Sequence, residues 1–88
     1  MHTVELLQEA LEAARGLGYD VRQDWLGGDG GGHCLIRGRR MLLLDVAQSP
    51  DEQLDVVADA LCGEVPTTLK VSGQLAERLK TRAAALAA

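Results

Sequence analysis

Apolar residues recur at helical spacing near the start of the chain and then change to alternation. Residues 3–17 carry an apolar stripe at intervals of three and four, which predicts a helix that stops at a left-handed Gly18. Residues 19–25 alternate with period two, which predicts a half-buried strand. Its buried side should carry Tyr19, Val21 and Trp25, and its polar side Asp20, Arg22 and Asp24.

Five glycines stand among the six residues from Gly27 to Gly32, a composition typical of a loop between strands. Two apolar runs then flank Gly38. They predict a hairpin with strands at about 33–37 and 40–46.

The segment from Ser49 to Glu52 is the clearest helix start in the chain. Ser49 suits the N-cap, Pro50 suits the first helical position, and Glu52 completes a capping box. Gly63 should end this helix. Its buried stripe should consist of Leu54, Val57, Ala58 and Leu61.

Residues 65–71, with Pro66, look extended or irregular, and Ser72 then caps a last helix that runs into the terminal alanines. One face of this helix should hold Leu75, Leu79, Arg82 with Ala83, and Leu86. The order α-β-β-β-α-α predicts one α+β domain over residues 1–88. We expect a three-stranded, mostly antiparallel sheet with helices packed on one face.

The composition is that of an ordinary globular protein, with 47% hydrophobic and 25% charged residues. A net charge of −4 opposes generic binding to nucleic acid or to an anionic membrane, so we expect neither as a partner. The first residues have no signal-peptide pattern, and Cys34 and Cys62 are expected as reduced, buried thiols. These features predict a cytoplasmic protein.

The glycine loop is the first candidate for chemistry, either as a ligand site or as a plain connection between strands. No Gly-Lys-Ser/Thr follows it, and the next element is a strand rather than a helix. Asp45 follows an apolar run, and it is expected to be part-buried and paired with a hairpin arginine. The candidate ligand-binding residues are Gly28, Asp29, Gly31, Gly32, Cys34 and Asp45.

Metal and catalytic signatures are not expected in this chain. His33 and Cys34 are adjacent in a strand, so they project to opposite faces and cannot easily share one ion. We therefore predict no metal, no cofactor and no catalytic residue. Two charged groups are interpreted as solvated surface: the hairpin arginines (Arg37, Arg39, Arg40) and one helix face (Glu52, Asp55, Asp59).

The run Met41–Leu44 is apolar at consecutive positions, so a strand there presents apolar side chains to both faces of the sheet. One face can be covered by helices. The other should be covered either by the last helix or by a second copy, and we expect a symmetric dimer. The candidate interface residues are Leu35, Met41, Leu42 and Leu43.

The stretch Gly31–Asp45, followed by Glu52-Gln53-Leu54 and Ala58–Leu61, resembles a group of small bacterial proteins of unassigned function. The same strand–turn–strand–helix order is similar to the start of ImmA/IrrE-type zinc peptidases, which implies a helix bearing His-Glu-x-x-His. The helix here reads Val57-Ala58-Asp59-Ala60-Leu61, so the zinc chemistry cannot be carried over.

These patterns predict a non-catalytic binding or assembly module. The alternative is a thiol-based enzyme or redox-responsive protein that uses Cys34 beside the glycine loop. The reactivity of Cys34 near neutral pH discriminates between the two.

Overall fold

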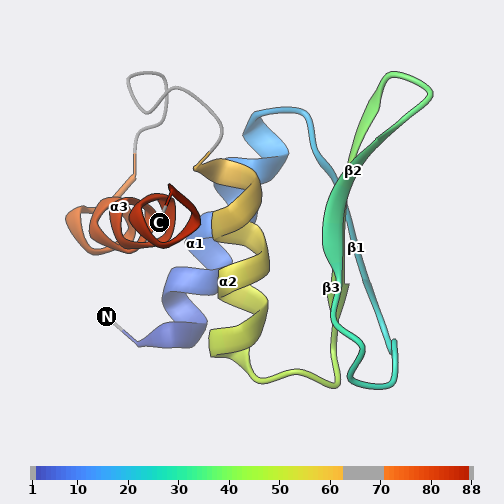
Figure 1. Ribbon diagram of the computed structural model, residues 1–88, viewed down its shortest axis with the longest axis horizontal. Coiled ribbons are helices and arrows are strands. Elements are labelled where there is room, and N and C mark those ends of the chain that lie inside the picture. Colours follow the sequence, from blue (N-terminus) through green and yellow to red (C-terminus); the bar gives the residue numbers. More distant parts are fainter. Residues whose placement is uncertain (1, 63–70, 88) are drawn as a thin grey trace.

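The computed structural model describes residues 2–62 and 71–87 (Figure 1). The elements of this described part are α1 (Thr3–Gly16), β1 (Asp20–Asp24), β2 (Gly32–Ile36), β3 (Arg39–Asp45), α2 (Pro50–Leu61) and α3 (Gly73–Ala87). The α+β class and the order of elements are therefore confirmed. The helix stop at Gly63 and the extended stretch at 65–71 lie outside the described residues, apart from Val71.

The sheet is mixed, with strand order β1-β3-β2. The expected hairpin is present: β2 and β3 are antiparallel, and their two-residue turn has positive φ at both Arg37 (51°) and Gly38 (79°). This type I′ geometry matches the natural twist of paired strands. β1 instead pairs with β3 in parallel. The chain must therefore cross the end of β3 to pass from β1 to β2, and the glycine loop makes that crossing.

Side chains of β3 alternate between two environments. Leu42 and Leu44 are fully buried beneath α1 and α2, which cover one face of the sheet (Figure 1). Most of the remaining core is aliphatic and comes from these two helices: Leu7, Ala10, Leu11, Ala14, Leu54, Val57, Ala60 and Leu61. The apolar stripes of the helices and the inward side chains of β3 therefore pack into one core.

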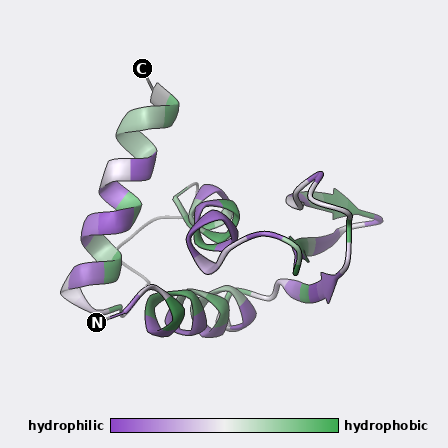
Figure 2. Cartoon of the chain, turned by 90° about the horizontal axis from the view of Figure 1, so that it is seen from below, coloured by the Kyte–Doolittle hydropathy of each residue, from purple (hydrophilic) through white to green (hydrophobic). Residues whose placement is uncertain are grey.

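The helix α3 packs on the far side of the helical layer (Figures 1 and 2). Within the described residues it contacts α1 and α2 but not the sheet. Leu75 is fully buried there, whereas Leu86 is 55% exposed. The predicted face that Leu75 and Leu86 share is therefore buried only in part, because the C-terminal end of α3 extends clear of the other helices (Figure 2).

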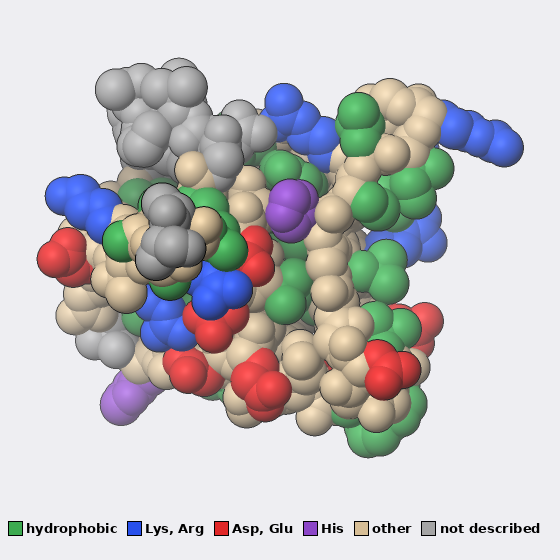
Figure 3. Space-filling model, in the orientation of Figure 1, with side chains coloured by type: hydrophobic (Ala, Val, Ile, Leu, Met, Phe, Trp, Pro, Cys, Tyr) green, Lys and Arg blue, Asp and Glu red, His purple; other side chains and the backbone are tan. Residues whose placement is uncertain are grey.

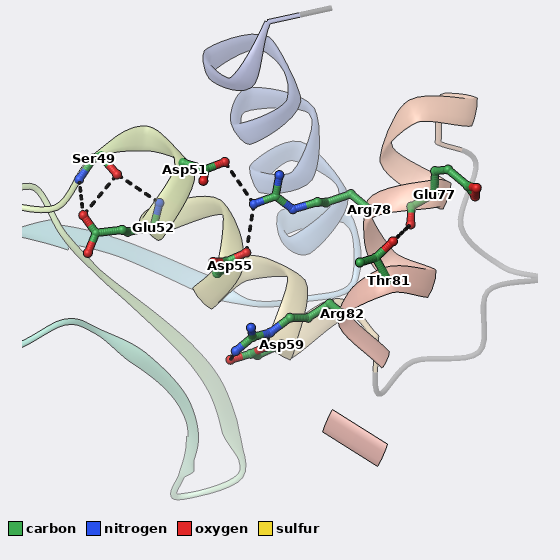
Figure 4. Close-up of polar contacts among 9 residues, drawn as sticks. All are labelled: Ser49, Asp51, Glu52, Asp55, Asp59, Glu77, Arg78, Thr81 and Arg82. Carbon is green, nitrogen blue, oxygen red and sulfur yellow. Dashed lines mark hydrogen bonds and ion pairs between the residues drawn. The ribbon is translucent and has the colours of Figure 1, made fainter. Parts of the chain in front are cut away.

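Opposite charges at matching helical spacing hold α3 against α2 (Figure 4). Arg78 Nη2 lies 3.0 Å from Asp51 Oδ1 and 2.9 Å from Asp55 Oδ1. One turn further on, Arg82 forms a two-pronged contact with the Asp59 carboxylate. The interpretation of Asp55 and Asp59 as a merely solvated face is therefore wrong, since these carboxylates receive the arginines of α3.

The first strand is shorter than its alternation predicts. Gly18 has φ +93° and ends α1 as expected, and Val21 packs against the core. Trp25, however, lies beyond the end of β1 and is 70% exposed. Its backbone N–H is bonded to the Asp24 carboxylate at 2.8 Å, so the chain turns out of the ladder before Trp25 can point into the core.

The capping box at the start of α2 is present as predicted (Figure 4). Glu52 N–H donates to Ser49 Oγ, and Ser49 N–H donates to Glu52 Oε1, both at 3.2 Å. Together these bonds satisfy two backbone donors that a bare helix start leaves without partners.

Replacing the cap should destabilise the fold measurably. Ser49→Ala removes the acceptor for Glu52 N–H, and we expect it to lower the free energy of unfolding by about 1 kcal/mol. Urea unfolding of the purified variant measures this change. Gln8→Ala, at an exposed position within α1, is the control. A loss for Ser49→Ala no larger than that of the control would contradict the stabilising role of the cap.

Candidate functional site

One face of the sheet carries no helix of the described chain, and we call it the open face. Strand register decides which side chains it displays, because paired residues point to the same side. Leu43 and Met41 point away from the helices, and their partners on β1 and β2 share that side. The open face therefore carries Asp20, Arg22, Asp24, Gly32, Cys34, Ile36, Arg39, Met41 and Leu43.

The middle of the open face is apolar and its surroundings are charged. Ile36 is 52% exposed, Cys34 is exposed, and Met41 and Leu43 are half-buried. Figure 3 shows hydrophobic side chains along the outer side of the sheet with charged groups of both signs near them. The expectation that Cys34 is buried is wrong, because nothing in the described chain packs over its strand on this side.

The four candidate interface residues divide between the two sides of the sheet. Met41 and Leu43 lie on the open face, whereas Leu42 is fully buried in the core. Leu35 pairs with Arg40 and so faces the helix side. It remains 69% exposed, because the hairpin projects past the helices there (Figure 1).

The carboxylate of Asp45 organises the glycine loop. Its Oδ1 accepts the backbone N–H groups of Leu26 at 3.0 Å and Ala47 at 2.9 Å, and its Oδ2 accepts Gly30 N–H at 3.1 Å. Burial alone raises the pKa of the Asp45 carboxyl. The hydrogen bonds from Ala47, Leu26, Gly30 and Gly28 outweigh that effect and hold the pKa below its ordinary value of 3.8.

The loop also needs glycine for a steric reason. A Cβ on Gly31 would lie 1.8 Å from the carbonyl oxygen of Leu43, closer than any real contact. Gly28 and Gly30 have φ of +86° and +83°, which other residues rarely adopt. The glycines therefore allow the loop to pack tightly against the end of β3.

The structure brings Asp45 and the loop together, and the Asp45 carboxylate itself accepts the loop N–H groups. An anion bound by the loop would need backbone N–H groups such as those of Gly30 and Leu26, which Asp45 already occupies. Asp29 is exposed, and Cys34 lies on the strand that follows. The expected ion pair between Asp45 and a hairpin arginine is wrong, because six positions of β3 separate Arg39 from Asp45.

The remaining polar candidates do not converge. Arg40 turns to the helix side, where its guanidinium lies 5.7 Å from the centre of the Tyr19 ring, while Arg39 lies on the open face. His33 faces the helix side, opposite to Cys34. The residues the structure describes contain no group of His, Cys, Asp or Glu side chains arranged to hold a metal ion.

Two further features concern the helices. A groove of about 230 Å³ lies between α2 and α3, and its lining is Leu61, Cys62, Val71, Ala76, Leu79, Lys80 and Ala83. This lining is almost wholly aliphatic, so the groove offers little polar chemistry. Among residues 2–62 and 71–87, no helix has the length and apolar character needed to cross a bilayer.

Asp45 should control both stability and its dependence on pH. Asp45→Asn turns one acceptor into a donor facing Gly30 N–H, and we expect the melting temperature to fall by about 10 °C. Because the folded pKa is depressed, the stabilisation is present above the ordinary value of 3.8 and is lost as pH falls through the folded value. Thermal melts between pH 2 and 7 should therefore show less acid sensitivity in the variant. The matched control is Asp29→Asn in the same loop, and equal effects of the two changes would contradict the role of Asp45.

Comparison with known proteins finds no matching family model, no matching curated protein and no matching solved structure. No family or activity is therefore assigned to the chain through a relative.

Proposed function

We propose that this protein is a non-catalytic binding and assembly module, and that its binding surface is the open face of the sheet. The observation that carries the proposal is the exposure of an apolar centre, formed by Cys34, Ile36, Met41 and Leu43, on a face that α3 leaves bare. Contiguous apolar surface on a small protein commonly marks an interface.

A second copy of the chain is the occupant that fits the charges. The open face carries carboxylates (Asp20, Asp24) and guanidinium groups (Arg22, Arg39) around its apolar centre. A surface with both signs can complement itself under a two-fold axis, which is the commonest closed symmetry of oligomers. The two free cysteines are consistent with a reducing compartment such as the cytoplasm.

The exposure of Cys34 also favours a second candidate, a thiol-based protein. Its cross-strand neighbour is Met41, and the adjacent His33 points to the opposite side of the sheet. A thiolate is usually activated by a nearby base or cation. Because His33 is turned away, the assembly role is the stronger proposal, and the labelling experiment below separates the two.

Leu43→Glu should convert a dimer into a folded monomer. The substitution places a carboxylate in the apolar centre of the open face, and we expect the dimer Kd to rise about a hundredfold or more. Sedimentation equilibrium at micromolar concentration measures the assembly state, and far-UV circular dichroism verifies folding.

Leu35→Glu is the matched control, because Leu35 is an exposed leucine on the other side of the hairpin. It should leave the dimer intact. Leu42→Glu should instead unfold the chain, since Leu42 is fully buried. A 9.4 kDa species for the unmutated protein at every concentration would overturn the proposal.

Cys34 should be shielded by assembly. In a Cys62→Ala background, alkylation of Cys34 at neutral pH should slow as protein concentration rises through the dimer Kd. The Leu43→Glu variant should be labelled at one rate throughout. Rapid labelling of the unmutated protein at all concentrations would favour the thiol-based alternative.

A further inference from the structure

The charges on β1 alternate in sign at the same levels as the apolar residues of β3. Asp20 lies beside Met41, Arg22 beside Leu43, and Asp24 beside Asp45. On β2 the same two central levels hold Cys34, beside Met41, and Gly32, beside Leu43. At these two central levels the open face thus has three columns, charged on β1, apolar on β3 and small on β2.

Two face-to-face arrangements with two-fold symmetry keep the strands of the two sheets aligned. If the axis runs along the strands, the β1 column of one copy lies over the β2 column of its partner. Asp20 would then be desolvated against the partner's Cys34, and Arg22 against the partner's Gly32, neither of which offers a charged partner. Burying unpaired charge in this way is costly.

If the axis runs across the strands, each column lies over its own copy in reversed direction. With the axis at the level of Leu42, residues at the Met41 level face residues at the Leu43 level of the other copy. Met41 then meets the partner's Leu43, and Cys34 meets the partner's Gly32, which leaves room for the thiol. Asp20 meets the partner's Arg22, twice by symmetry.

We infer that two copies pair through their open faces in this antiparallel arrangement, with Asp20 of each copy opposite Arg22 of the other. The inference rests on the proposed function and names the geometry of that same interface. Within one chain Asp20 and Arg22 already approach to 3.5 Å, and their side chains are 39% and 66% exposed, so both can turn toward a partner. Charge complementarity then fixes orientation and excludes the parallel alternative.

A mixing experiment tests the orientation. Arg22→Asp leaves two carboxylates at these positions, and Asp20→Arg leaves two guanidinium groups. Each variant alone should oppose like charges at the interface and raise the dimer Kd at least about tenfold. An equimolar mixture should form a heterodimer with a Kd within about threefold of the unmutated value, because every facing pair is again of opposite sign.

Gln23→Asp and Gln23→Arg are the matched controls, since Gln23 is exposed on the same strand but points to the helix side. They should dimerise like the unmutated protein, and mixing them should give no gain. Sedimentation equilibrium of each variant and each mixture in 0.15 M salt gives the Kd values.

The outcomes separate the two proposals. An unmutated protein that stays monomeric overturns the proposed function and this inference with it. If the unmutated protein is a dimer and Leu43→Glu dissociates it, the proposed function stands. The orientation is then overturned if either charge variant dimerises normally, or if their mixture remains monomeric.

Discussion

The sheet depends on the hydrogen bonds that the Asp45 carboxylate accepts from backbone N–H groups. Because β3 lies between β1 and β2, the chain has to cross the end of β3, and an irregular crossing exposes backbone N–H groups that need acceptors. Asp45 supplies those acceptors from the last position of β3 itself. Glycine makes the crossing possible, since Gly31 passes so close to Leu43 that no side chain fits. The structure thus needs all three together: the parallel pairing of β1, the tight loop and the buried carboxylate of Asp45.

The open face of the sheet has no helix over it because α3 packs against the other helices. Leu75 and two arginines, Arg78 and Arg82, direct α3 onto the outer side of α2. A helix held there cannot also cover the sheet. The arrangement is a sheet, a layer of two helices, and a third helix beyond them (Figures 1 and 2). Among residues 2–62 and 71–87, no helix therefore covers the open face, whose centre is apolar.

The hydrogen bonds between Asp45 and the glycine loop, together with the position of α3, favour the open face over the loop as the candidate site. The glycine run resembles a ligand loop in composition, but its N–H groups already bind a carboxylate of the same chain. The open face, by contrast, presents apolar groups without a partner in the described chain and charges of both signs around them. A binding surface is the role that this combination of features supports best.

Local patterns in the sequence determined the elements of this protein, their order and the capping box at Ser49, because each depends on neighbours within a few residues. The split of the Met41–Leu44 run between two faces also follows from the sequence, since a strand alternates. Tertiary structure decided the strand order, the hydrogen-bond partners of Asp45 and the docking of α3. Matching rows of acids (Asp51, Asp55, Asp59) and arginines (Arg78, Arg82) were a readable signal for that docking. Which face stays bare depends on long-range packing, which no local pattern encodes.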